Sequence, residues 1–207
     1  MAYADLFWIP LGAGGHSVAF NGRVFEYLAA AAHHRRRRDL YHAALVAEFG
    51  GERYAIELAP SPDAGEASRG VVGTGPVGSR ALERLRVFRY EVRCWRGGAI
   101  PDIGYAVGGP VRLTTDPDVA RRLVVLAAQA PRPVWGRDEM HAGEMWNSNS
   151  MIAWVIAAAG LPAEDLQPPG GGRAPGWNAG VVVAHRRVPA PRPRQVGGSS
   201  LRSSASP

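Results

Sequence analysis

The sequence predicts an α+β fold in which an antiparallel β-sheet carries a core helix packed on one face. Three observations support this class: strand-like runs dominate the first half, a Gly-Gly pair separates two of them, and two segments with helical spacing follow. With 46% hydrophobic residues in 207, the chain has enough apolar material for one core. We expect one domain over residues 1–185 and a disordered Arg/Pro/Ser tail over 186–207.

The strands are predicted from hairpin signals and from alternation. A strand at Phe7–Leu11 precedes a hairpin over residues 17–26, in which Asn-Gly joins two strand-like runs. A second hairpin joins Tyr41–Phe49 to residues 53–58 through Gly-Gly. Residues 86–93 alternate polar and apolar side chains and belong to the same sheet.

Loops and helices complete the expected order. Glycine, proline and serine over residues 61–79 predict a loop. An N-cap followed by proline predicts a helix over residues 115–129, and a core-facing helix is expected over residues 148–159, with Gly160 at its end. Residues 179–184 are interpreted as a last strand.

The positive charge is concentrated in the tail. The net charge is +6, but five of the 24 arginines lie from Arg186 onward, where there is no acidic residue. The first 185 residues therefore carry 19 arginines against 18 acidic residues. The tail is expected to solubilise the protein, and nucleic acid is expected to bind only weakly and only through the tail.

No apolar run approaches the roughly 20 residues of a membrane-spanning helix, and the N-terminus lacks the pattern of a signal peptide. A cytoplasmic location is therefore expected. Cys94, the single cysteine, is interpreted as structural, and we expect no cofactor and no metal.

Several common catalytic motifs are absent: the phosphate-binding loop, the Gly-x-Ser-x-Gly elbow, the His-Glu-x-x-His pair and the dinucleotide fingerprint. Asp138, Glu139, His141 and Glu144 form the densest group of possible metal ligands. Their spacing matches no metal geometry, so a solvated loop before a helix explains them better.

A more informative set of residues is spread over three places. His42 opens one strand, and the return strand of the same hairpin carries Glu57, whose carboxylate we expect to orient the imidazole. Ser148 opens the apolar helix, where unpaired N–H groups and the helix dipole favour an oxyanion. This combination predicts nucleophilic catalysis.

The order of these elements resembles the circularly permuted branch of the papain-like NlpC-type superfamily, which includes lecithin retinol acyltransferases and PPPDE-type isopeptidases. Over residues 40–160, His42 matches the strand histidine that is the base in those families, and Asn147-Ser148-Asn149 matches their Asn-Cys helix start. The resemblance implies His42 as base and Ser148 at the position of the nucleophile, with Glu57 roughly in place of the third residue.

The departure from the family pattern is Ser148, since serine is a far weaker acid than cysteine. Three interpretations remain open: a working serine nucleophile, an inactive site retained for binding, and an ordinary N-cap residue. We also assign substrate contacts to Asn147, Trp146, Trp177 and Arg173, the last two from a loop that closes over the site.

The leading functional hypothesis is therefore an acyl or amide hydrolase or transferase with a serine nucleophile and a histidine base. The alternative is a papain-like binding module without enzymatic activity. A third, less favoured hypothesis is a nucleic-acid binder that acts through its tail. The sequence leaves the substrate open among small molecules, peptides and lipids.

Overall fold

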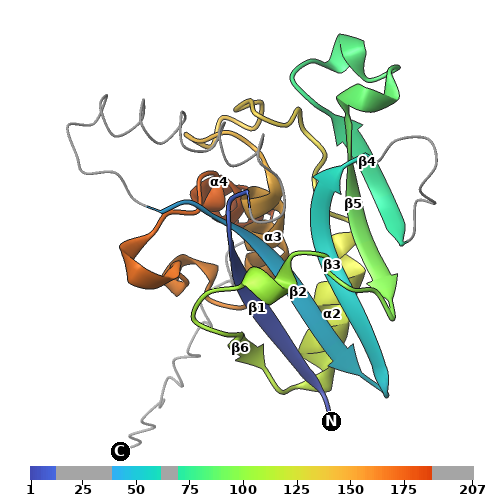
Figure 1. Cartoon of the computed structure of the whole chain (residues 1–207). Coiled ribbons are helices and arrows are strands. Elements are labelled where there is room, and N and C mark those ends of the chain that lie inside the picture. Colours follow the sequence, from blue (N-terminus) through green and yellow to red (C-terminus); the bar gives the residue numbers. More distant parts are fainter. Residues whose placement is uncertain (13–38, 62–69, 188–207) are drawn as a thin grey trace, which may run out of the picture.

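The computed structural model describes residues 1–12, 39–61 and 70–187, and these form a sheet with helices on one side (Figure 1). The antiparallel sheet has six strands in the order β4-β5-β3-β2-β1-β6, and three α-helices follow β6 in the chain. The α+β class is therefore confirmed. The strands are β1 (Tyr3–Pro10), β2 (Tyr41–Phe49), β3 (Glu52–Pro60), β4 (Val71–Pro76), β5 (Arg89–Arg96) and β6 (Val111–Thr114). The helices are α2 (Pro117–Ala127), α3 (Ser148–Ala158) and α4 (Trp177–Arg187).

The hairpin of β2 and β3 forms as predicted. Gly50 and Gly51 adopt φ values of 60° and 78°, a left-handed conformation that glycine accepts without steric cost. Pairing runs from Phe49 opposite Glu52 to Leu45 opposite Ile56. Beyond that point no further β2–β3 pair is present among the described residues, and the two strands separate (Figure 1).

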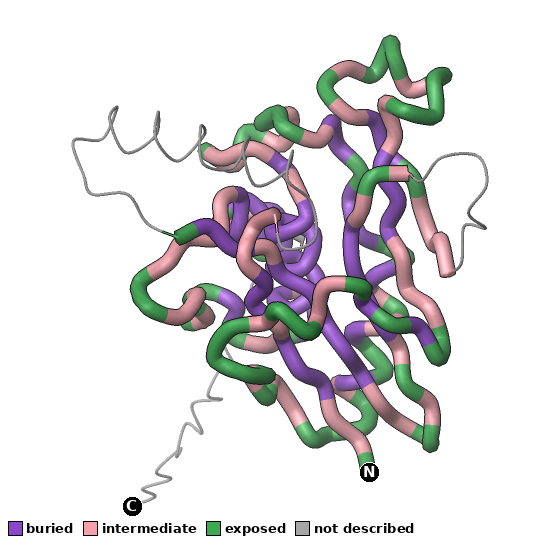
Figure 2. The backbone as a smooth tube through the Cα atoms, in the orientation of Figure 1, coloured by how far each residue is buried: buried purple, intermediate pink, exposed green. Residues whose placement is uncertain are grey.

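The main core lies between the sheet and the helices, and α3 is at its centre (Figure 2). Every residue of α3 except Ala158 is buried, and α4 packs against it on the side away from the sheet. The predicted start of α2 is confirmed, since Asp116 is its N-cap and Pro117 its first residue. Burying an apolar helix on all sides is a large contribution to the hydrophobic stabilisation of this fold.

The other face of the sheet is crossed by residues 97–110, which run from β5 over β3, β2 and β1 to β6 (Figure 1). Ile100 packs there with Ala44, Val46 and Ala55, and the N–H of Val107 donates to the carbonyl of Trp8 at 2.9 Å. This crossing segment covers a second, smaller core. It also places side chains from the middle of the sequence over the strand that carries His42.

Three sequence-based predictions are corrected. Strand β4 lies within the predicted loop 61–79, because its two glycines allow close packing of Tyr90 and Arg132. Strand β5 begins at Arg89, three residues later than the predicted start at residue 86, after a 3₁₀ turn. The predicted last strand, 179–184, is part of α4: its valine run favours a strand, but packing against α3 decides the conformation.

Two other predictions concern residues outside the described ranges, namely the hairpin at 17–26 and most of the tail at 186–207. Arg186, which the prediction assigns to the tail, belongs to α4 and donates to the carbonyl groups of Met140 and His141. Within the described ranges, no helix is long and apolar enough to cross a bilayer.

Gly180 is predicted to be required for the α3–α4 contact. A Cβ atom at this position would lie 2.0 Å from the carbonyl oxygen of Ser150, so Gly180→Ala should lower the free energy of unfolding by about 1–3 kcal/mol. This expectation opposes intrinsic helix propensity, which favours alanine by about 1 kcal/mol. Thermal and urea unfolding would measure the change, with exposed Asn178→Ala in the same helix as the control. Equal stability of the Gly180→Ala and Asn178→Ala variants would show that the two helices are not in tight contact.

Candidate active site

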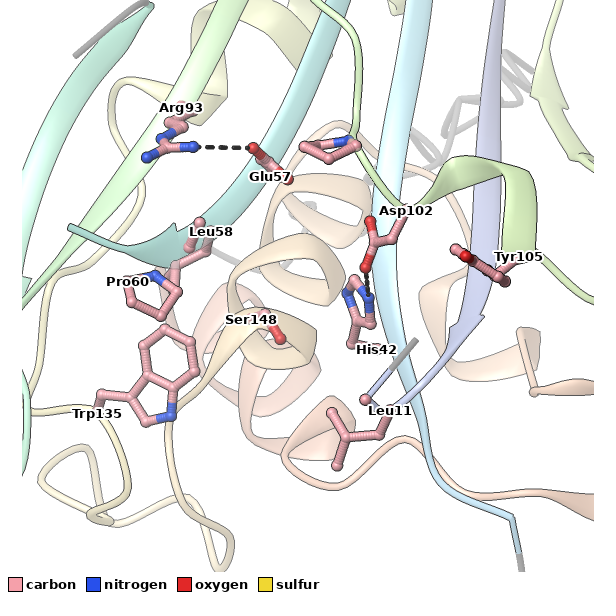
Figure 3. A pocket seen from close by; sticks show the side chains of 13 residues that line it. Leu11, His42, Glu57, Leu58, Pro60, Arg93, Asp102, Tyr105, Trp135 and Ser148 are labelled. Atoms are coloured by element: carbon pink, nitrogen blue, oxygen red, sulfur yellow. Dashed lines mark hydrogen bonds and ion pairs between the residues drawn. The ribbon is translucent and has the colours of Figure 1, made fainter. Parts of the chain in front are cut away.

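A cavity of about 600 Å³ lies where β2 and β3 separate, next to the N-terminus of α3 (Figure 3). The three residues predicted to be catalytic, His42, Glu57 and Ser148, all line it. They come from β2, β3 and α3, so the fold brings together residues more than a hundred positions apart. The other lining residues are Leu11, Gly12, Leu58, Ala59, Pro60, Arg93, Pro101, Asp102, Tyr105 and Trp135.

Asp102 of the crossing segment orients the imidazole of His42. The distance between His42 Nε2 and Asp102 Oδ2 is 2.8 Å, and both side chains are mostly buried (Figure 3). Burial tends to raise the pKa of Asp102, but the hydrogen bond and the charge of His42 outweigh it, so the pKa lies below its ordinary value. A carboxylate in this position holds the imidazole ring in one orientation.

This pairing defines which nitrogen of His42 is available as a base. Asp102 accepts the hydrogen bond from Nε2, so that nitrogen carries the proton when the ring is neutral. The lone pair is then on Nδ1, and Nδ1 is the atom that would accept a proton from a nucleophile.

Ser148 is not the N-cap of α3, so the N-cap interpretation is wrong. Asn147 is the N-cap: its side chain accepts the N–H of Ser150 at 3.2 Å, and Ser150 Oγ accepts the N–H of Asn147 at 3.1 Å. Ser148 follows as the first residue of the helix. Among the described residues its hydroxyl has no hydrogen-bond partner, which leaves it available to a molecule in the cavity.

Asn149 connects the two elements that carry Ser148 and His42. Its buried Nδ2 donates to the carbonyl oxygens of Tyr41 and Pro175, each at 3.0 Å. Because Tyr41 directly precedes His42, this bond fixes the start of β2 against the start of α3. It therefore limits how far the hydroxyl and the imidazole can move apart.

Ser148 and His42 approach the cavity from different layers. Tyr41 and Ala43 pack with α3, so the alternation of β2 directs His42 to the face covered by the crossing segment. The cavity joins the two layers because β2 and β3 have separated at this point (Figure 3). Within the described part of the chain, no hydrogen bond joins Ser148 to His42. Catalytic hydrogen bonds of this kind are often long without substrate.

Glu57 does not orient His42, contrary to the prediction from the hairpin register. Its carboxylate faces Arg93 on the neighbouring strand β5, with 3.4 Å between Oε1 and Nη1, and Arg93 also pairs with buried Glu91 at 3.0 Å. Burial raises the pKa of Glu57, although the charge of Arg93 opposes this shift. Glu57 is therefore a largely buried carboxyl group of the cavity wall that has Arg93 as its charged neighbour.

The remaining wall of the cavity is mainly apolar. The backbone N–H of Trp135 donates to the carbonyl of Pro76 at 2.8 Å, and its ring makes an edge contact with Tyr90, with 5.7 Å between ring centroids. Leu11, Leu58 and Tyr105 line other parts of the cavity. A volume of this size with a few convergent polar groups suits a small organic molecule or one segment of a larger substrate.

The predicted substrate contacts lie elsewhere. Trp146 and Trp177 are core residues, and the Nε1 of Trp177 donates to the carbonyl of Ala163 at 2.8 Å. Asn147 caps α3, and Arg173 lines a separate small pocket beside Glu144. In the part of the chain that the structure describes, none of these four lines the 600 Å³ cavity.

Asp102 is the functional residue that sequence reasoning missed. It lies 60 positions from His42 in an irregular segment, and no local motif marks it. The available signal was indirect: a carboxylate in a Gly/Pro-rich connection long enough to cross a sheet. Trp135, Tyr105 and Arg93 were missed as cavity residues for the same reason, since each comes from a different element.

Three acidic residues of the cluster before α3 are engaged in hydrogen bonds or ion pairs within the protein. Asp138 accepts the N–H groups of Ala142 and Gly143, and Glu139 pairs with Arg80. Glu144 accepts the N–H of Gly176 at 2.9 Å. The described residues contain no group of three or more His, Cys, Asp or Glu side chains that could hold a metal ion. Cys94 is partly buried, and burial raises the pKa of its thiol to about 11, consistent with a structural role.

Comparison of the chain with protein-family models, with curated proteins and with solved structures gives no match. The fold and site define a class only at a coarse level: an α+β protein with a serine, a histidine and an aspartate around one cavity. The functional argument therefore rests on the geometry of that cavity.

Replacing Asn147 and Ser148 separately should distinguish capping from function. Asn147→Ala removes the N-cap and should lower the free energy of unfolding by about 1 kcal/mol, within a range of about 0.5–2. Ser148→Ala removes a hydroxyl without a partner among the described residues and should change the free energy of unfolding by less than about 0.5 kcal/mol. Urea unfolding of the two neighbouring variants provides the comparison. A larger loss for Ser148→Ala would show that the serine is the structural residue.

The pKa of Asp102 should depend on His42. NMR titration should place it below the ordinary value in the native protein and higher in the His42→Ala variant, where burial is opposed only by a backbone hydrogen bond. A lowered pKa stabilises the folded state above the unfolded carboxyl's pKa of about 3.9. That stabilisation is lost as the pH falls through the pKa of the folded state. An unchanged pKa in the variant would contradict the proposed pairing.

Proposed function

We propose that this protein is a hydrolase or transferase of acyl or amide groups, with Ser148 as nucleophile, His42 as general base and Asp102 as the residue that orients His42. The observation that carries the proposal is that one cavity is lined both by a serine that is not the helix N-cap and by a histidine paired with an aspartate. In this proposal Asp102 orients the imidazole of His42, a role that the sequence-based hypothesis gave to Glu57.

In the first step, Ser148 Oγ attacks the carbonyl carbon of the substrate while its proton passes to His42 Nδ1. A C–O bond forms, and the π electrons of the carbonyl move to its oxygen. The protonated imidazole is stabilised by the carboxylate of Asp102.

The N-terminus of α3 offers donors for the resulting oxyanion. The N-cap engages the N–H of Ser150, and among the described residues the N–H groups of Ser148 and Asn149 have no acceptor. These groups lie at the positive end of the helix dipole beside the attacking oxygen. In enzymes with an oxyanion hole, removing one such donor lowers kcat by about 10²–10³.

In the second step, the imidazolium gives its proton to the leaving oxygen or nitrogen as the bond to the acyl carbon breaks. An acyl ester on Ser148 remains, and water or another acceptor, deprotonated by His42, releases it. Glu57 and Arg93 on the opposite wall contact the leaving group or the acyl portion, and the apolar residues around Trp135 hold the carbon skeleton.

The second candidate is a binding module that retains the cavity without catalysis. The observation in its favour is that Ser148 and His42 are not hydrogen-bonded to each other. In that case His42, Asp102 and Glu57 would recognise a polar ligand, and Ser148 would contribute only a hydrogen bond. The two functions differ in whether the hydroxyl reacts.

A fluorophosphonate probe should label Ser148. In that reaction Oγ displaces fluoride from phosphorus, and His42 takes the hydroxyl proton, so peptide mass spectrometry should locate the adduct on this serine. Ser148→Ala should abolish labelling, and His42→Ala should slow it by about 10² or more. Asp102→Asn should slow it more than Glu57→Gln, because Asp102 pairs with His42 and Glu57 pairs with Arg93.

Two controls define the result. Ser79→Ala, a turn-capping serine outside the cavity, should leave the labelling rate unchanged, and heat-unfolded protein should not react. Absence of labelling in folded native protein would reject the enzyme and favour the binding module. Labelling that survives His42→Ala at the native rate would show that the histidine is not the base.

A further inference from the structure

The segment Arg80–Arg89, here called the tip, projects beyond the ends of β4 and β5 (Figures 1 and 2). It contains two 3₁₀ turns, Arg80–Leu82 and Arg86–Phe88. Three of its large apolar side chains face solvent: Leu82, Leu85 and Val87 are 39%, 55% and 76% exposed. A cluster of exposed apolar residues on one projection indicates an interaction surface.

The backbone of the tip is held in place, so this exposure is not the result of a loose segment. Arg89 donates to the carbonyl groups of Glu83 at 2.5 Å and Arg84 at 3.1 Å. At the base of the tip, Arg80 forms a two-bond ion pair with Glu139, at 2.9 and 2.8 Å. The fold therefore presents Leu85 and Val87 to solvent in a fixed conformation.

The charge of the tip indicates what it contacts. Every exposed charged residue in the tip is an arginine, and the single acidic residue, Glu83, is partly buried. Arginine and apolar residues alternate from Arg84 to Val87. An anionic lipid surface matches both parts of this pattern, because it offers phosphates to the arginines and acyl chains to the apolar side chains of a projecting turn.

We propose that the tip docks on a bilayer that contains anionic lipids. Leu85 and Val87 enter the boundary between headgroups and acyl chains, and the guanidinium group of Arg84 contacts lipid phosphates. This contact is peripheral and reversible, and it differs from a membrane-spanning anchor. It is independent of the chemistry proposed for Ser148.

The tip and the cavity lie at the same end of the sheet. Pro60 lines the cavity and pairs with Tyr90, which directly follows the tip. Docking through Leu85 and Val87 would therefore bring the cavity close to the lipid surface. This arrangement requires no change in the fold.

Co-sedimentation of the full chain with vesicles tests the proposal. The native protein should bind vesicles of phosphatidylcholine and phosphatidylglycerol, bind pure phosphatidylcholine much less, and lose affinity as salt is raised. The double variant L85S/V87S should reduce binding to the anionic vesicles about tenfold or more, and Arg84→Glu should reduce it by several-fold. Val125→Ser, an exposed valine on α2, is the matched control and should bind like the native protein.

The outcomes separate docking through the tip from binding by another part of the chain. The proposal would be overturned if the native protein failed to bind anionic vesicles. It would also be overturned if L85S/V87S bound them as well as the native protein does, and that result would assign binding to another basic region such as the tail. A dimer in light scattering that L85S/V87S abolishes would assign the tip to self-association instead. Ser148→Ala should bind vesicles normally, so failure of the enzymatic proposal would not affect this result.

Discussion

The burial of α3 is the constraint on which the rest of this structure depends. An apolar helix enclosed by the sheet on one side and α4 on the other leaves little solvent for its first polar groups, so most of their hydrogen bonds are made within the protein, although the buried Oδ1 of Asn149 has no partner among the described residues. Asn147 and Ser150 satisfy each other, and Asn149 reaches the backbone of β2. Ser148 is the residue of this turn that remains directed at the cavity, and its availability follows from its neighbours' roles.

The charged side chains of the cavity lie on the face of the sheet opposite α3. His42, Glu57 and Arg93 lie on strands at the point where β2 and β3 separate, and the crossing segment brings Asp102 over them. Two carboxyl groups in similar surroundings thus have opposite pKa shifts: the pKa of Asp102 is lowered by His42, and that of Glu57 is raised by burial. The difference follows from their partners, since Asp102 is hydrogen-bonded to His42 and Glu57 faces Arg93 at 3.4 Å.

Much of the fold could be predicted because its signals are local. The Gly-Gly turn of β2 and β3, the Asp116-Pro117 start of α2 and the Asn-Ser-Asn start of α3 each act within a few residues. The errors arose where distant contacts decide the conformation. Valines 181–183 favour a strand by propensity, but α4 forms because Gly180 allows it to pack closely on α3. The glycines of β4 favoured a loop prediction, but in the structure they belong to a strand and make room for Tyr90 and Arg132.

The sequence by itself determined that a strand histidine, a returning carboxylate and a helix-initial serine belong to one fold of the α+β class, since turn and cap signals act over short distances. Only the tertiary structure decided which carboxylate meets the histidine. Hairpin register favoured Glu57, but the adjacent strand β5 supplies Arg93 as its partner, and the crossing segment delivers Asp102 from 60 residues away. Such pairings depend on how distant chain segments pass over one another, and this arrangement cannot be predicted from a local sequence pattern.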